Sequence, residues 1–166
     1  MNLPSPDELI ETLATRIAAD IQPNCALVGM HTGGVWVMEA LAERLGGDLP
    51  CGTVDTAFYR DDYAQRGLHD GVKPSRIGFD VDGRCILLID DVLNTGRSVR
   101  AAINQLFDYG RPAAVRLAVL IDRNGRELPI QPDYCAHRLD LPTPQRLRLG
   151  RDDSGQLSLV LTERSA

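Results

Sequence analysis

The chain has 166 residues, of which 43% are hydrophobic and 25% are charged, and its formal net charge is −5. This length and composition are typical of a soluble globular protein, and we expect residues 1–166 to form a single domain. The negative charge argues against a protein that coats nucleic acid indiscriminately, and no apolar run is long enough to cross a membrane.

The cysteines argue against a disulfide or zinc framework. Cys25, Cys51, Cys85 and Cys135 stand far apart and form no Cys-x-x-Cys pair. The first three lie in or beside apolar runs, so we expect them to be small buried side chains in a reducing compartment. Because the N-terminus also lacks a signal-peptide pattern, the expected location is the cytoplasm.

The first elements in the chain are a helix, a strand and a glycine-containing loop. Ser5 to Glu8 is a capping-box pattern and predicts a helix from Pro6 to Ile21. The apolar run Cys25 to Met30 predicts a strand, and a helix is predicted from Val35 to Leu45. Between them lies His31-Thr32-Gly33-Gly34, in which successive glycines can adopt φ > 0 and direct several N–H groups inward as an anion-binding nest. The alternative is an ordinary tight turn.

A long polar segment follows a β-prone run that begins at Thr53. From Tyr59 to Gly83 the chain is rich in Gly, Asp and Arg. A loop of this length inside a compact domain is usually functional, and often it is a lid over a binding site.

The most informative segment lies between residues 86 and 109. Ile86 to Ile89 is a continuous aliphatic run, which is typical of a strand buried on both faces of a parallel sheet. Asp90 and Asp91 follow it directly, and open α/β sheets bind ligands at this end of their strands. The donor-rich turn Asn94 to Ser98 then leads into a helix predicted from Val99 to Tyr109.

This order of residues predicts two neighbouring binding functions. The carboxylates can hold a diol or a metal ion, and the turn at the helix N-terminus can hold a phosphate. A phosphorylated sugar would match both. The alternative is a buried strand, a polar turn and a helix cap without chemistry, but the whole combination is much more specific than two adjacent aspartates.

The remaining chain completes an α/β pattern. Ala114 to Ile121 predicts another strand, and the polar residues 122–130 follow at its carboxyl end. Arg146 to Leu149 and Leu157 to Leu161 predict a C-terminal β-hairpin. Residues 111–151 carry eight arginines against four acidic residues, so this part could bind phosphates or RNA, or could be a solvated surface.

The central motif resembles that of the type I phosphoribosyltransferases, which use 5-phosphoribosyl-1-pyrophosphate (PRPP). The segments 59–62, 99–102, 110–112 and 120–130 are similar to those of the PyrR family of pyrimidine operon regulators and uracil phosphoribosyltransferases. The resemblance implies a mostly parallel sheet flanked by helices, with a small hood. It also implies transfer of ribose 5-phosphate from PRPP to uracil, with Mg²⁺, to give UMP and pyrophosphate. Further implications are UMP-dependent binding to pyr mRNA and a homodimer or larger homo-oligomer.

The resemblance also implies roles for individual residues. Asp90 and Asp91 would be catalytic and hold the ribose hydroxyls, directly or through Mg²⁺-bound water. The lid would begin at Tyr59, Arg60, Asp61 and Asp62, and the base and hood residues would be Arg123, Arg126 and Leu147. The PRPP-binding loop would comprise Asp90, Asp91, Val92, Leu93, Asn94, Thr95, Gly96, Arg97 and Ser98, and the pyrophosphate loop His31, Thr32, Gly33 and Gly34.

One departure from the family pattern leaves alternative functions open. The PyrR pyrophosphate loop usually carries arginine, close to Arg-Thr-Arg-Gly, whereas this chain has His-Thr-Gly-Gly from His31 to Gly34. A first alternative is therefore a nucleotide-sensing RNA-binding regulator with little or no turnover. A second is a transferase for a different base, because base specificity depends on a hydrogen-bond pattern that the sequence does not reveal.

Overall fold

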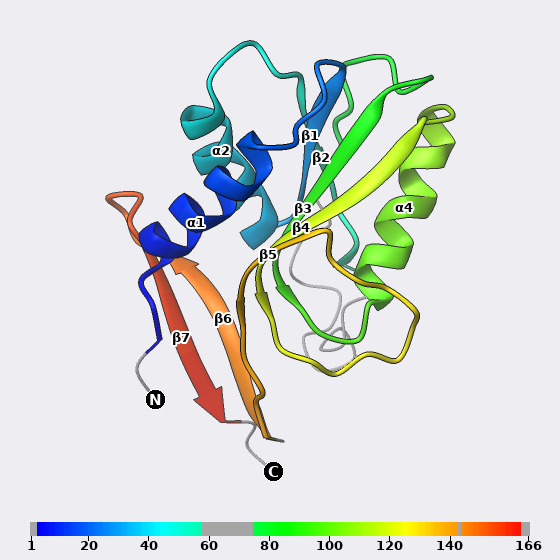
Figure 1. The fold of residues 1–166 in the computed structure, drawn as a ribbon. Helices are drawn as coiled ribbons and strands as arrows, with labels where there is room; N and C mark the ends of the chain where they lie inside the picture. Colours follow the sequence, from blue (N-terminus) through cyan, green and yellow to red (C-terminus); the bar gives the residue numbers. More distant parts are fainter. Residues whose placement is uncertain (1–2, 58–74, 143, 164–166) are drawn as a thin grey trace.

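The computed structural model describes residues 3–57, 75–142 and 144–163, and in them a parallel sheet lies between two layers of helices (Figure 1). The five parallel strands have the order β2-β1-β3-β4-β5, and β6 and β7 form a separate antiparallel hairpin. The α/β class and the C-terminal hairpin are therefore confirmed. The elements are α1 (Pro6–Ala18), β1 (Cys25–Met30), α2 (Gly33–Leu45), β2 (Cys51–Val54), β3 (Cys85–Leu93), α4 (Arg97–Tyr109), β4 (Ala114–Asp122), β5 (Tyr134–Arg138), β6 (Gln145–Arg151) and β7 (Leu157–Glu163).

Strand β3 is buried on both faces, as its aliphatic run predicts. Leu87 and Ile89 belong to the apolar cluster beneath α1 and α2, whereas Ile86 and Leu88 belong to the cluster beneath α4. Successive side chains of a strand point to opposite faces, so an uninterrupted apolar run is what a sheet covered on both sides requires. The strand thus joins both cores.

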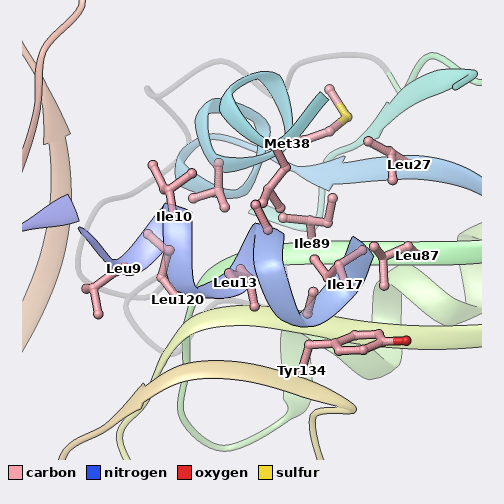
Figure 2. Packing of buried hydrophobic residues seen from close by; sticks show 14 of the residues in the cluster. Leu9, Ile10, Leu13, Ile17, Leu27, Met38, Leu87, Ile89, Leu120 and Tyr134 are labelled. Atoms are coloured by element: carbon pink, nitrogen blue, oxygen red, sulfur yellow. The ribbon is translucent and has the colours of Figure 1, made fainter. Parts of the chain in front are cut away.

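Helix α1 covers one face of the sheet through side chains at helical spacing. Leu9, Ile10, Leu13 and Ile17 are buried, and Figure 2 shows them directed at the strands and at α2. Ser5 accepts a hydrogen bond from the Glu8 amide and the Glu8 side chain accepts one in return, so the predicted capping box is confirmed. The helix ends at Ala18, three residues before the predicted limit.

The hairpin β6-β7 packs on the same side as α1. Leu147 and Leu149 are buried in the cluster beneath α1 and α2. At the end of β6, the Arg151 guanidinium lies 5.0 Å from the centre of the Trp36 ring and pairs with Glu39 at 3.0 Å. The hairpin is therefore joined both to the sheet's core and to α2.

Several boundaries differ from the sequence-based expectation, each for a local reason. Strand β3 continues through both aspartates to Leu93, because it keeps pairing with β4 along that length. Cys51 is exposed rather than buried, because it begins the edge strand β2. Within the residues that the structure describes, no helix has the length and apolar character that a membrane crossing needs.

A polar cluster connects the residues just after α1 to strands β4 and β5. The Tyr134 hydroxyl donates to Asp20 at 2.8 Å, and Arg116 donates to the same Asp20 oxygen at 2.9 Å. The hydrogen bond from Tyr134 and then the charge of Arg116 lower the pKa of Asp20. Because folding lowers the pKa of Asp20, the ionised carboxylate stabilises the folded protein at any pH above the pKa that Asp20 has in the unfolded chain. This contribution is lost as the pH falls through the lower pKa of Asp20 in the folded protein.

We therefore expect Tyr134→Phe to destabilise the protein in a pH-dependent way. The free energy of unfolding should fall at about pH 7, and the difference from wild type should shrink as the pH falls through the lowered pKa of Asp20, below which Asp20 is protonated in both proteins. Urea denaturation over a series of pH values from neutral to acid measures this difference. Tyr109→Phe, at an exposed position of α4, is the control. A difference that stays constant over this range would contradict the role given to Asp20.

Candidate functional site

The strand order places two loops together at one edge of the sheet. From β1 the chain passes through α2 to β2 on one side, and from β3 it passes through α4 to β4 on the other side. Because β1 and β3 are parallel neighbours, the loops that leave their carboxyl ends lie on either side of the point where the winding reverses. Ligands of open α/β sheets bind at such a switch point. The sequence predicted both of these loops as binding loops.

The two aspartates lie at the end of β3, within this edge. Asp90 is buried, and one of its carboxylate oxygens accepts a hydrogen bond from the Asp91 amide at 2.9 Å. Asp91 is partly exposed, and its carboxylate lies against the start of α2, where a Cβ atom on Gly33 would come within 2.3 Å of Asp91 Oδ2. The structure therefore brings the second carboxylate and the β1–α2 loop together.

The two glycines of the β1–α2 loop act differently from the sequence-based expectation. Gly33 and Gly34 are the first residues of α2, and neither has a positive φ, so the expected nest built on φ > 0 is wrong. Glycine is required there because α2 lies very close to β3: a Cβ atom on Gly34 would lie 2.4 Å from the backbone oxygen of Ile89. The peptide bond between His31 and Thr32 is cis.

The helices α2 and α4 begin at the site with N-termini unlike that of α1. The N-cap residues Thr32 and Gly96 provide no side-chain cap, and neither helix has an acidic residue in its first turn. By contrast, α1 has both Asp7 and Glu8 in its first turn and a complete capping box. Since a helix N-terminus carries partial positive charge, the two starts at this edge suit anionic ligands.

The turn that enters α4 is held from one side by the segment after β4. Thr95 is buried, and its backbone oxygen accepts hydrogen bonds from the amides of Glu127 and Leu128 at 3.0 and 3.2 Å. The Arg97 guanidinium pairs with the Glu127 carboxylate at 2.6 Å, and both side chains are about half exposed. Gly96 has φ 92°, a conformation that glycine adopts readily. The turn is therefore a defined structure rather than a loose connection.

The other predicted site residues lie around this turn. Arg123 donates from its amide to the Leu93 oxygen and from its side chain to the Gln145 oxygen in β6. Arg126 donates to three protein oxygens. The side chain of Leu93 is buried beneath α4, and that of Leu147 is buried beneath α1 and α2, so only their backbone groups are available to a ligand. Val92 packs against the same cluster as Leu147.

The expected lid lies beyond what the structure describes. Tyr59, Arg60, Asp61 and Asp62 fall in 58–74, outside the described residues. Ser98, in the first turn of α4, is partly exposed.

Asp90 and Asp91 suit an Mg²⁺ ion that is held partly by water and substrate oxygens, rather than by protein ligands alone. The described parts of the chain contain no group of three or more His, Cys, Asp or Glu side chains placed to hold a metal. Mg²⁺ keeps several of its waters and commonly binds through one or two carboxylates together with substrate phosphate oxygens. Asp90 and Asp91 supply that number of carboxylates.

Sequence reasoning overlooked Asp122 and Glu127. Asp122 is a buried carboxylate at the end of β4, and it binds the side chain of Arg126 and the amide of Asn124. Glu127 binds Arg97. The available signal was their place directly after a strand on the ligand side of the sheet. The partners of Asp122 lie only two and four residues away, whereas Glu127 meets Arg97, thirty residues earlier in the chain, only in the folded protein.

Sequence comparison shows close relatives with a common description. Residues 6–141 match the family described as phosphoribosyl transferase domain. The chain is 49% identical over 153 residues to "Bifunctional protein PyrR" of Pseudomonas aeruginosa, covering 90% of each chain. It is 47% identical over 170 residues to the protein of the same name from Nitrosococcus oceani, covering 96% of each.

Structural comparison finds the same fold in more distant proteins. A hypoxanthine-guanine phosphoribosyltransferase from Bacillus anthracis is similar with a TM-score of 0.67 and 17% identity, over 84% of each chain. A purine phosphoribosyltransferase from Pyrococcus horikoshii has a TM-score of 0.61 and 23% identity, over 81% of this chain and 82% of its own. At this level of identity the similarity shows a shared fold, that is, the same arrangement of helices and strands.

The close approach of α2 to β3 predicts the effect of a single methyl group. We expect Gly34→Ala to lower the free energy of unfolding by about 1–3 kcal/mol, because the added atom meets backbone on β3 and the two elements must separate. Urea denaturation measures the loss. Gly78→Ala is the matched control, because it adds the same atom where nothing lies within 4 Å and φ is ordinary. Equal stabilities of the two variants would contradict this account.

Proposed function

The chain belongs to the PyrR proteins of the phosphoribosyl transferase domain family, and from that premise we propose that it transfers ribose 5-phosphate from PRPP to uracil, giving UMP and pyrophosphate. One observation supports this most: two helix N-termini without side-chain caps lie at the switch point, with Asp90 and Asp91 between them along the chain. PRPP carries a phosphate at one end of its ribose and a pyrophosphate at the other. Its two anionic groups match two helix starts, and its hydroxyls match the carboxylates.

Each part of PRPP then has a proposed position. The turn from Asn94 to Ser98 binds the 5-phosphate through backbone amides and the dipole of α4. The loop from His31 to Gly34 binds the pyrophosphate at the start of α2. Asp90 and Asp91 hold the ribose hydroxyls, either directly or through water bound to Mg²⁺.

The chemistry requires little covalent participation from the protein. The bond between the ribose C1 and the pyrophosphate oxygen breaks, and the electron pair leaves with pyrophosphate. The positively charged ribose then bonds to a uracil nitrogen, which gives up its proton to water or to the leaving pyrophosphate. The site accelerates this by fixing the two reactants, stabilising the charge on each side and excluding water. Mg²⁺, when bound, neutralises charge on the leaving pyrophosphate.

Uracil is proposed to bind beneath the C-terminal hairpin. Arg123 connects the end of β4 to the first residue of β6, and Leu147 can offer backbone groups from the same strand. Tyr59 to Asp62 remain the proposed start of the lid, which would close over PRPP.

Regulation of pyrimidine genes is the second part of the proposal. In PyrR-like proteins UMP binding favours association with pyr mRNA, and the arginines of residues 111–151 are the candidate contacts in this chain. We propose that the protein does this in the cytoplasm as a homodimer or larger homo-oligomer. Binding that depends on arginine–phosphate contacts should weaken steeply as salt is raised.

The composition of the pyrophosphate loop supports a second candidate function. His31 to Gly34 lacks the arginine that the family usually has there, and a charge-assisted hydrogen bond to the leaving group is worth roughly 1.5–3 kcal/mol. Without it the protein would bind UMP and PRPP but turn over slowly, and its main role would be nucleotide-dependent RNA binding.

A transferase assay decides between the two functions. We expect Mg²⁺-dependent formation of UMP and pyrophosphate from PRPP and uracil, with the other free bases tested in parallel. UMP formation would show that backbone donors and His31 replace the missing arginine. Tight UMP binding without product would contradict the transferase proposal and favour the regulator, and product from another base alone would contradict the choice of uracil.

The carboxylates give the sharpest test of the site. We expect Asp90→Asn and Asp91→Asn each to lower kcat/KM for PRPP by about 10- to 100-fold, because each keeps the shape but loses a charged hydrogen-bond acceptor. Asp153→Asn, at an exposed turn between β6 and β7, is the matched control. If neither site variant lowers PRPP binding or turnover, the assignment of the site to this edge is wrong.

A further inference from the structure

The backbone oxygens of residues 93–95, where β3 leads into the 5-phosphate turn, all face one segment. Leu93 O accepts from the amide of Arg123 at 3.0 Å, and Thr95 O accepts from the amides of Glu127 and Leu128. Between them, Asn94 O accepts from the Arg126 side chain at 2.9 Å. Three successive carbonyl groups are therefore held by residues 123–128.

This arrangement fixes the direction of the neighbouring amides. In a trans peptide the carbonyl of one residue and the N–H of the next point in opposite directions. With the oxygens of residues 93–95 directed at the segment 123–128, the N–H groups of residues 94–96 are directed away from it. Holding the carbonyls thus presents a row of donors on the other side of the turn, where a phosphate can be bound.

Arg126 supplies the one side-chain donor among these bonds. Its guanidinium also donates to the Ile130 oxygen at 2.8 Å and to Asp122 Oδ2 at 2.6 Å. The side chains of Arg126 and Asp122 are 16% and 7% exposed, so water competes little for these bonds. Three directional donors on a rigid plane are a property of arginine that lysine does not share.

Close packing limits any movement of the turn away from this segment. A Cβ atom on Gly125 would lie 2.3 Å from Asn94 Oδ1, and one on Gly96 would lie 3.0 Å from the Ile130 side chain. The two surfaces touch along their length. A bond from Arg126 therefore acts on a turn that has little room to rearrange.

We propose that Arg126, held by the buried Asp122, is a positioning residue that fixes the amide donors of residues 94–96 for the 5-phosphate, and so gives the site its preference for phosphorylated over unphosphorylated nucleosides. The inference rests on the proposed function and extends it, because it assigns Arg126 to the turn rather than to the base. Arg126 acts through Asn94 and does not itself touch the phosphate.

The test compares ligands that differ only in the 5-phosphate. Calorimetric titration of wild type, Arg126→Gln and Arg126→Lys with UMP and with uridine separates the effect on the phosphate from effects on the rest of the site. We expect Arg126→Gln to raise the Kd for UMP by about 10- to 100-fold, with the Kd for uridine changed by less than about twofold. Arg126→Lys, which keeps the charge but not the three-way geometry, should weaken UMP binding almost as much.

Turnover gives a second readout of the same effect. The KM for PRPP should rise with Arg126→Gln, whereas the KM for uracil should not change. Arg44→Gln is the matched control, because Arg44 also makes ion pairs and a backbone hydrogen bond, but with α1 and α2 away from the site. Should Arg126→Gln fail to fold, Asp122→Asn removes the counter-ion of Arg126 and should weaken UMP more than uridine.

The possible results are distinguishable. Equal losses for UMP and uridine, or an unchanged Kd for UMP, would overturn the positioning role of Arg126. Wild-type protein that binds neither PRPP nor UMP would overturn the proposed function itself, and with it the premise of this inference.

Discussion

The site depends on how closely helix α2 approaches the end of strand β3. Gly34 lies so near Ile89 that a single side-chain carbon would reach within 2.4 Å of that residue's oxygen, and Gly29 has a comparable contact of 2.8 Å with Val35. This closeness places the start of α2 against the Asp91 carboxylate. A side chain at Gly34 would push α2 away from β3, and one at Gly29 would push α2 away from β1. Either change would displace the start of α2 from the end of β3, and a ligand that must reach both would no longer fit.

Much of the fold could be predicted because its signals are local. The aliphatic run of β3 indicated a strand covered on both faces, and α1 and α4 cover it as expected. The capping box at Ser5 marked a helix start that the structure reproduces, and α2 ends at Leu45, as predicted. The two aspartates and the turn after them were recognisable because the type of each residue and its place relative to a strand and a helix carry the information together.

The rest depends on contacts between distant segments, which local patterns do not encode. Gly33 and Gly34 suggested a nest by their conformational freedom, but their neighbours across the sheet require their small size instead. Cys51 resembled a core residue until the strand order placed it on an edge. The bond from Arg126 to Asn94 in the 5-phosphate turn joins residues 32 positions apart, so the sequence around Arg126 carried no local sign of it, although its counter-ion Asp122 lies only four residues away.

The packing of the hairpin on α1 has a consequence for how the protein is made. The apolar cluster that begins with Leu9 and Ile10 includes Leu147 and Leu149, and the hairpin begins beyond residue 141, where the family match ends. The first helix therefore leaves the ribosome long before the last of its packing partners has been synthesised. Contacts between the two ends of a chain form late and slowly, so the face of α1 stays incompletely covered until synthesis is nearly finished.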